Sequence, residues 1–333
     1  DAKTTPFFVL SLPRSGSTML QRLLNAHDDI ATSPEPWILL PIASMFREDL
    51  ARARYDQHRA VEAIGDFTGD LPDGTDGFKR SLNTMLLDTY TEAADGARYF
   101  LDKTPRYSLI ADEVRAIFPE SPIIILWRNP LAVAASIIKG WGVGRWNLFL
   151  YREDLYAGLR NLVAFADKQG DAVLIVGYED IVRNPEAEMA RMLEFLDLDV
   201  PDEVELAEGY DAKEFGDPFG SRYGSQVSTA SIDSWTETFN NPVRRIWARR
   251  YLRSLGPDLL RRMGYSEAEL LAQLKTEKLS LKWTASDLLR IAAGWFYDLA
   301  TNGRPSPIRQ ASQSFQKTKL GSKYNWQSTK DEA

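Results

Sequence analysis

The sequence predicts an α/β fold with three layers, in which helices cover both faces of a mostly parallel central sheet. Short apolar segments typical of strands alternate with segments whose apolar residues have helical spacing. Two of the strands lead into the same Arg-Asn-Pro sequence, at 128–130 and 183–185, and asparagine followed by proline favours a helix start. Repeated units of strand, crossover helix and strand build a parallel sheet with right-handed connections.

The first strand, PFFVLSL at 6–12, leads through a glycine-containing turn into a helix with one apolar face. That face is formed by Met19, Leu20, Leu23 and Leu24. Later strands, each short, apolar and bounded by turn residues, are expected at 29–33, 97–102, 122–127 and 172–178. Between the second and third strands the pattern is helical, which predicts an insertion at about 37–95.

The chain of 333 residues is long enough for a large core, since 44% of its residues are hydrophobic. We expect one domain at 1–265 and a helical extension with a polar tail at 266–333. Within the extension, LLRIAAGWFYDLA at 288–300 is interrupted by charges and is too short to span a bilayer. It is typical of an amphipathic packing or interface helix.

The composition indicates which classes of binding partner and which cellular compartment to expect. A formal net charge of -7 at pH 7 disfavours a nucleic-acid partner. The absence of cysteine excludes disulfides, zinc–thiolate sites and thiol nucleophiles, and it fits a reducing compartment. No signal-like apolar segment opens the sequence. We therefore expect a soluble, cytoplasmic protein with no transmembrane segment.

The stretch LPRSGSTMLQRLL at 12–24 lies between the first strand and the first helix. Backbone N–H groups at a helix start bind anions when a glycine permits close approach. Arg14 would add charge, and the neighbouring donors are Ser15, Gly16, Ser17 and Thr18. A plain helix cap would explain the same residues. A Walker A motif is excluded because Gly16 is followed by serine and not by lysine, which disfavours triphosphate–magnesium chemistry.

This loop resembles the 5′-phosphosulfate loop of sulfotransferases that use 3′-phosphoadenosine 5′-phosphosulfate (PAPS) and are similar to nucleotide kinases in fold. The family binds the 3′-phosphate with an arginine after a later strand and a serine eight residues on, and Arg128 and Ser136 have that spacing. PRSGSTMLQRLLNAH followed by SPE is similar to the Golgi-type and bacterial branch, which includes tyrosylprotein and polyketide-linked sulfotransferases. The resemblance implies a P-loop-like fold.

The resemblance also implies catalytic residues. Glu35 lies where the tyrosylprotein branch has its proposed catalytic glutamate, and a plain turn residue between two prolines is the alternative. Lys103 resembles the lysine that, with Arg14, meets the leaving phosphate, and a solvated loop lysine is the alternative. Asp102 could orient Lys103 or serve as a rival base. Neither histidine of the chain is expected to be the base.

Further residues are implied to contact the nucleotide. Tyr178 resembles a nucleotide-contacting tyrosine of the family, although it could simply pack over the sheet edge. The carboxyl ends of different strands carry Arg14, Glu35, Lys103, Arg128 and Tyr178, and ligands of open α/β sheets bind outside those ends. The segment 139–149, with Trp141 and Trp146, could be a hinged lid or a plain loop over the core.

A late loop at 216–235 resembles the family loop that closes on the 3′-phosphate. Its possible contacts are Arg222, Ser225 and Ser228. Ser234 precedes Trp235, whereas the tyrosylprotein branch has a nucleotide-contacting lysine before this tryptophan.

We interpret the chain as a metal-independent PAPS sulfotransferase of secondary metabolism that uses direct in-line transfer to a hydroxyl or amine. The expected acceptor is a small molecule, a natural product or a sugar. In this hypothesis Glu35 takes the acceptor proton, Lys103 and Arg14 stabilise the departing bisphosphate, and the remaining residues hold the nucleotide. The alternatives are a P-loop small-molecule kinase and a non-catalytic protein that binds a nucleotide bisphosphate.

Overall fold

A single parallel sheet forms the centre of the protein, in a computed structural model that describes residues 4–33, 35–47, 50, 57–200 and 230–302. The strands are β1 (Thr5–Ser11), β2 (Ile30–Thr32), β3 (Tyr99–Asp102), β4 (Ile123–Trp127) and β5 (Leu174–Gly177). They lie in the order β2-β3-β1-β4-β5, and every described pairing is parallel. The predicted α/β class and mostly parallel sheet are confirmed.

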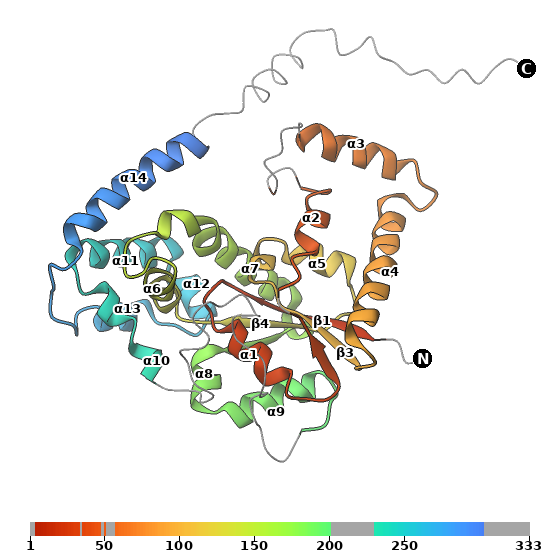
Figure 1. Ribbon diagram of the computed structural model, residues 1–333, viewed down its shortest axis with the longest axis horizontal. Coiled ribbons are helices and arrows are strands. Elements are labelled where there is room, and N and C mark those ends of the chain that lie inside the picture. Colours follow the sequence, from red (N-terminus) through yellow and green to blue (C-terminus); the bar gives the residue numbers. More distant parts are fainter. Residues whose placement is uncertain (1–3, 34, 48–49, 51–56, 201–229, 303–333) are drawn as a thin grey trace, which may run out of the picture.

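Helices cover both faces of the sheet, as the alternation of strand side chains requires. Phe7 and Val9 of β1 belong to one buried cluster, whereas Phe8 and Leu10 belong to another. The first cluster is covered by helices that lie below the sheet in Figure 1, namely α1 (Ser17–Leu24), α8 (Tyr178–Arg183) and α9 (Pro185–Phe195). The three predicted layers are therefore present.

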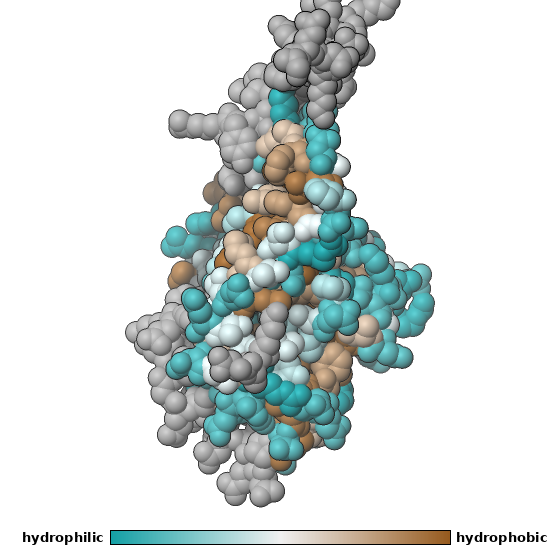
Figure 2. All heavy atoms as spheres, turned by 90° about the vertical axis from the view of Figure 1, so that its right-hand side faces the viewer, coloured by the Kyte–Doolittle hydropathy of each residue, from teal (hydrophilic) through white to brown (hydrophobic). Residues whose placement is uncertain are grey.

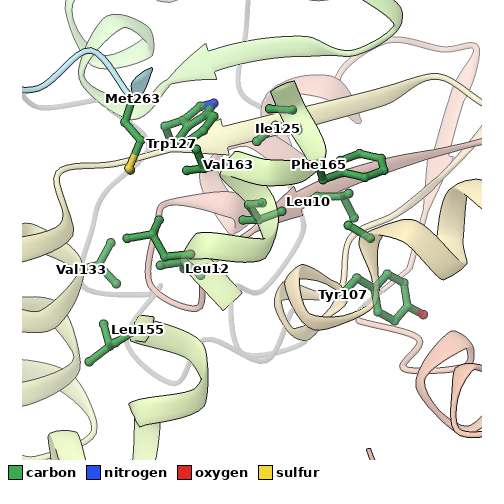
Figure 3. Packing of buried hydrophobic residues seen from close by; sticks show 14 of the residues in the cluster. Leu10, Leu12, Tyr107, Ile125, Trp127, Val133, Leu155, Val163, Phe165 and Met263 are labelled. Atoms are coloured by element: carbon green, nitrogen blue, oxygen red, sulfur yellow. The ribbon is translucent and has the colours of Figure 1, made fainter. Parts of the chain in front are cut away.

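The larger cluster lies on the opposite face, where side chains from distant parts of the chain interdigitate (Figure 3). Helices and short helical turns contribute to it from much of the sequence, including α5 (Ala111–Ile117), η1 (Pro105–Leu109), α6 (Pro130–Gly140), η2 (Leu148–Tyr151), η3 (Glu153–Gly158), α7 (Leu159–Gln169), α11 (Pro242–Leu255), α12 (Pro257–Arg262) and α13 (Glu267–Gln273). Three further short helical elements are η4 (Gly170–Ala172), α10 (Ala230–Asp233) and η6 (Thr236–Phe239).

The described residues between β2 and β3 are mostly helical, as expected from their pattern. They form α2 (Leu39–Ala43), α3 (Gln57–Gly69) and α4 (Gly74–Ala94). Figure 2 shows the face on the right of Figure 1, where hydrophilic residues lie at the sides and hydrophobic residues lie between them. Phe67 of α3 and Met85 of α4 are exposed, whereas Leu82 and Leu86 of α4 are buried in the larger cluster.

Both Arg-Asn-Pro sequences precede a helix start, as predicted, but only the first asparagine caps its helix. The Asn129 side chain accepts a hydrogen bond from the N–H of Leu131 at 2.9 Å. Asn184 makes no such side-chain bond. It directly follows α8, a helix that was not predicted, and its N–H donates to the Asp180 carbonyl at 2.8 Å.

The strand order reverses between β1 and β4, and we call the place at the carboxyl ends of these two strands the crevice. From β1 the chain continues to β2 and β3 on one side, and it then crosses to β4 and β5 on the other. Such a reversal leaves room between the loops that follow β1 and β4, which is where open α/β sheets bind ligands. The loop at 12–16 and the turn at 128–129 lie at this position.

The described C-terminal part ends in a long helix, α14 (Thr284–Asn302), at the upper left margin of Figure 1. Within the described ranges, no helix combines the length and the apolar character that crossing a bilayer requires. The division of the chain at 265 stays a prediction.

Candidate active site

The loop after β1 has the backbone conformation of an anion-binding turn. Arg14 and Gly16 have positive φ angles of 68° and 94°, and Gly16 is the N-cap residue directly before α1. A Cβ atom on Gly16 would lie 2.4 Å from Cδ2 of Tyr178. The first N–H groups of a helix lack intrahelical acceptors. The N–H groups at the start of α1 are therefore available as hydrogen-bond donors to an anion at the crevice. Ser15 and Ser17 are buried beside them, and Thr18 is half-buried.

Replacing Gly16 with alanine is expected to lower the free energy of unfolding by about 1–3 kcal/mol, because both the positive φ and the contact with Tyr178 penalise a Cβ atom. Gly96→Ala is the matched control, since Gly96 has a φ of 95° and no atom within 4 Å of the added Cβ. Urea unfolding of both variants measures the effect. Equal losses of stability would show that the Tyr178 contact contributes nothing.

Two arginines meet at the crevice. The Nη1 of Arg128 donates to the carbonyl oxygen of Arg14 at 3.0 Å, and its guanidinium lies 4.0 Å from the ring centroid of Tyr178. The Nε of Arg14 donates to Ser136 Oγ at 3.2 Å, and its guanidinium lies 5.6 Å from the ring centroid of Trp141. The structure thus brings together Arg14, Arg128, Ser136 and Tyr178, with Ser136 bonded to Arg14.

The Nε of Arg128 is buried and has no hydrogen-bond partner within the described part of the chain. A buried N–H without an acceptor is costly, and a charged donor in this position suits an anionic ligand. This unsatisfied donor and the Gly16 turn lie at one end of the sheet. The arrangement fits a phosphate-bearing ligand.

A buried carboxylate supports the turn that carries Arg128. Glu179 accepts from the N–H of Asn129 at 3.1 Å and from the hydroxyl of Tyr265 at 2.7 Å. Burial, with the Glu179 charge as a second cause, raises the pKa of Tyr265 far above its usual range, so this hydroxyl stays a donor. Sequence analysis missed this support, because a helical Glu and a distant Tyr carry no local signal.

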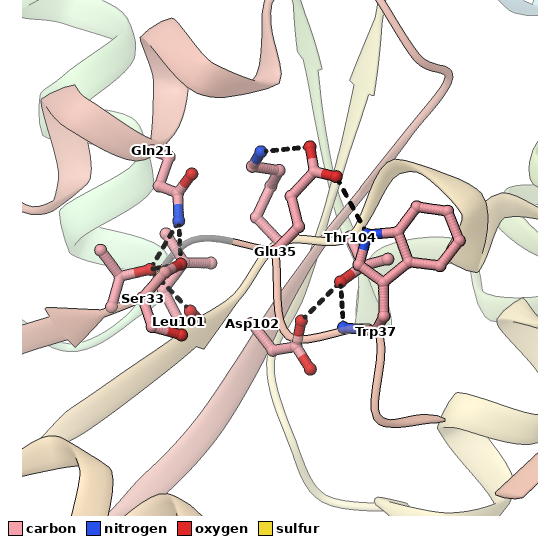
Figure 4. Close-up of polar contacts among 9 residues, drawn as sticks. Gln21, Ser33, Glu35, Trp37, Leu101, Asp102 and Thr104 are labelled. Carbon is pink, nitrogen blue, oxygen red and sulfur yellow. Dashed lines mark hydrogen bonds and ion pairs between the residues drawn. The ribbon is translucent and has the colours of Figure 1, made fainter. Parts of the chain in front are cut away.

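The second group of polar side chains follows β2 and β3. Lys103 Nζ lies 2.9 Å from Glu35 Oε1, with the lysine side chain fully buried and the glutamate side chain 22% exposed. The indole N–H of Trp37 donates to the other oxygen, Glu35 Oε2, at 3.2 Å (Figure 4). Lys103 is therefore not a solvated loop lysine. Glu35 is a carboxylate held by two donors that still reaches solvent.

Trp37 was not singled out by sequence analysis. It has a φ of 58°, unusual for a bulky residue, and its side chain is exposed. Its backbone N–H donates to Thr104 Oγ1 at 3.3 Å, and Thr104 donates to Asp102 Oδ1 at 3.2 Å. Backbone conformations of this kind persist where surrounding contacts fix them, often at functional sites. Here they place an exposed indole next to Glu35.

Asp102 is a buried residue that supports the Glu35–Lys103 group through Thr104. It is fully buried, and its Oδ2 accepts from the hydroxyls of Tyr90 at 2.7 Å and Tyr107 at 3.0 Å. Burial raises the pKa of Asp102 to about 6. Three donors on its oxygens and the lack of exposure disfavour Asp102 as a rival base.

Asp102 makes stability depend on pH in a defined direction. Because folding raises the pKa of Asp102 from 3.8 to about 6, the stabilising contribution of its neutral form is complete below the lower value. That contribution is lost as the pH rises through the higher value. Relative to wild type, Asp102→Asn should therefore gain roughly 2 kcal/mol of unfolding free energy between about pH 4 and pH 7. Urea unfolding at both pH values measures this, and a difference independent of pH would contradict it.

Helix α1 connects the two groups. It begins at the Gly16 turn, and its buried residue Gln21 donates to Thr32 Oγ1 at 2.7 Å and to the Ser33 carbonyl at 2.8 Å (Figure 4). Thr32 donates in turn to the Leu101 carbonyl at 2.8 Å. The loop that carries Glu35 is therefore fixed against both α1 and β3.

Of the predicted late loop at 216–235, the structure describes only residues 230–235. The proposed contacts Arg222, Ser225 and Ser228 lie outside the described residues. Ser234 accepts through its carbonyl from Lys139 at 2.8 Å, and the neighbouring Trp235 is buried in the core.

The aromatic residues of 139–149 differ from each other in burial. Trp146 is buried in the core, whereas Trp141 is half-buried, stacks on Tyr151 at 4.8 Å and faces Arg14. The segment is tied down by Arg244, which donates to the Gly144 carbonyl at 2.7 Å. These contacts favour a plain loop over a hinged lid.

His27 lies away from the described site. The ring of His27 contacts the carbonyl of Asp199 at 3.0 Å and accepts from the N–H of Asp29, which is a structural position. Over the described ranges, no group of three or more potential His, Cys, Asp or Glu metal ligands is found.

Comparison with known proteins finds sulfotransferases. The family model described as Sulfotransferase family matches residues 6–202. Nodulation protein NoeE of Sinorhizobium fredii is 30% identical over 78% of this chain and 66% of its own length. Protein-tyrosine sulfotransferase A of Caenorhabditis elegans is 25% identical over 79% and 68%, respectively. The chain thus spans about two thirds of the length of these relatives.

A solved structure supports the fold. The sulfotransferase domain of the Synechococcus PCC 7002 olefin synthase matches with a TM-score of 0.50 and 24% identity, covering 71% of this chain and 88% of that domain.

Proposed function

The chain belongs to the Sulfotransferase family, and from this premise we propose that it transfers a sulfuryl group from PAPS to a ring-bearing hydroxyl or amine acceptor. The observation that carries the proposal is the Glu35–Lys103 pair, at 2.9 Å, on the same sheet edge as the Arg14–Arg128 group. The kinase alternative has no support in the comparisons, which name sulfotransferases.

The nucleotide would be held by residues around the β1–β4 crevice. Phosphate groups suit the N–H groups of the Gly16 turn and the two guanidinium groups. The buried, unsatisfied Nε of Arg128 supports an anion at this place. Tyr178, which lies under the Arg128 guanidinium, would fix the plane of that group. When bound, PAPS supplies the sulfuryl group and a bisphosphate leaving group.

Glu35 would take the acceptor proton while Lys103 and Arg14 face the leaving bisphosphate. In the transfer, the bond between sulfur and the bridging phosphate oxygen breaks, a bond from sulfur to the acceptor forms, and the acceptor proton moves to Glu35. A protonated Glu35 no longer neutralises Lys103, from which it lies 2.9 Å away. The lysine charge is thus released as negative charge develops on the leaving group, so the two steps assist each other.

The exposed indole of Trp37 supports the choice of acceptor. An indole presents a flat apolar face, which suits an aromatic ring or the apolar face of a sugar. Because its N–H donates to Glu35, a ring stacked on this face would carry its hydroxyl toward the carboxylate. A small molecule, a natural product or a sugar of secondary metabolism fits this description. The cysteine-free sequence supports a cytoplasmic location.

Mass spectrometry of acceptor mixtures tests this proposal. The protein is incubated with PAPS and EDTA, together with phenols, methyl glycosides and aliphatic alcohols, and in parallel with ATP and magnesium. We expect sulfated phenols or glycosides despite the EDTA, and little product from the aliphatic alcohols. Phosphorylated products from ATP would support a kinase instead. Binding of the bisphosphate without any sulfated product would support a non-catalytic role.

A further inference from the structure

Helix α14 turns its large apolar side chains toward solvent. Leu288 and Leu289 are 55% and 74% exposed, and Trp295 and Phe296 are 61% and 64% exposed. The two pairs are seven residues apart, so they lie on the same side of the helix. Amphipathic helices of globular proteins normally bury this side.

The opposite side of α14 is fixed to the protein by polar and close contacts. Asp287 is buried, accepts from Arg244 Nε at 2.6 Å and Nη2 at 3.1 Å, and accepts from Asn241 at 2.7 Å. A Cβ atom on Gly294 would lie 2.7 Å from Phe149 Cγ, so the helix backbone packs directly on η2. These contacts set the rotation of α14, and the outward position of its leucines follows from them.

The apolar surface begins before the helix. Leu279 and Leu281 are 62% and 78% exposed, and Trp283 is exposed at the start of α14. We define the α14 patch as the exposed residues Leu279, Leu281, Trp283, Leu288, Leu289, Trp295 and Phe296.

The exposed charged residues in the sequence between 274 and 296 are basic. They are Lys275, Lys278 and Lys282, whereas Glu277 is half-buried and Asp287 is buried. The sequence is divided in the same way: 242–333 contains 17 Lys and Arg against 8 Asp and Glu, and 1–241 contains 23 against 39. The segment that contains α14 is thus basic in sequence, whereas the rest of the chain is acidic.

We propose that the α14 patch docks on an anionic lipid surface, with Trp295 and Phe296 at the boundary between headgroups and acyl chains and the lysines at the headgroups. Exposed apolar and aromatic residues combined with lysines are what such surfaces bind. A second copy of the chain fits less well, because a two-fold contact would bring two identical basic regions together. This docking is independent of the proposed transfer reaction.

Co-sedimentation with vesicles tests the docking. The full chain is mixed with vesicles of phosphatidylcholine alone or with phosphatidylglycerol added, at low and high salt. We expect binding to the anionic vesicles that weakens as salt screens the lysines. The double variant Leu289→Ser/Phe296→Ser should weaken this binding about tenfold or more, since it removes two inserted side chains. Phe67→Ser is the matched control, because Phe67 is 63% exposed on the distant helix α3, and it should bind as wild type does.

Several results would overturn the docking. These are absence of binding to anionic vesicles, binding that the α14 double variant leaves unchanged, and equal weakening by Phe67→Ser. Light scattering completes the test, because a dimer that the double variant dissociates would assign the α14 patch to a second copy. Circular dichroism of the variants shows whether they are folded, and all three substituted side chains are exposed.

Discussion

Glu35→Gln is expected to lower kcat about 10²- to 10⁴-fold, the usual contribution of a general base. Glutamine keeps the size of the side chain and can still accept from Trp37, but its amide cannot take the acceptor proton. Affinity for the bisphosphate product should stay close to that of wild type, since Glu35 lies after β2 and the arginine group lies after β1 and β4. Initial rates with a turned-over acceptor, and titration with the bisphosphate, measure the two effects.

Glu62→Gln serves as the control, because Glu62 is an exposed carboxylate on α3. It should leave both kcat and bisphosphate affinity unchanged. Unaltered turnover in Glu35→Gln would remove Glu35 from the mechanism.

Lys103→Met is expected to lower kcat about 10²- to 10³-fold, since it removes a cation that stabilises charge on the leaving group. Its effect on stability should be small, because methionine fills the buried volume of the lysine and Glu35 still reaches solvent. Glu35→Gln should cost more, about 1–3 kcal/mol of unfolding free energy, because the buried Lys103 then loses the carboxylate at 2.9 Å.

The double variant Glu35→Gln/Lys103→Met separates the two roles. It should recover most of the stability lost in Glu35→Gln, because no buried lysine charge remains, and it should stay inactive. Urea unfolding of the four proteins gives the coupling free energy. Additive losses of stability would mean that the pair is not coupled, in contradiction to the geometry.

The sheet could be predicted because its signals are local. Each strand is a short apolar run between turn residues, and the Arg-Asn-Pro sequences mark the helix starts at 130 and 185. In a parallel sheet the carboxyl ends of the strands share one edge, so residues that follow different strands could be assigned to one site before their contacts were known.

The supports of the site could not be predicted, because they depend on contacts between distant segments. Trp37, which donates to Glu35, has a positive φ, and its N–H donates to Thr104, a residue far away in the sequence. Hydrogen bonds from tyrosines of α4 and η1 to Asp102 disfavour this residue as a base. Similarly, the pattern of α14 predicted an amphipathic helix, but the rotation that exposes its leucines is set by the Arg244–Asp287 pair.

The nucleotide site is the centre of this account, and calorimetric titration with 3′-phosphoadenosine 5′-phosphate in the presence of EDTA tests it most directly. We expect one bisphosphate per chain to bind without a metal. Arg128→Ala should weaken this binding about 10- to 100-fold, since hydrogen bonds from charged donors are worth about 1.5–3 kcal/mol. Binding of ATP–magnesium in place of the bisphosphate, or bisphosphate binding that Arg128→Ala leaves unchanged, would contradict the account.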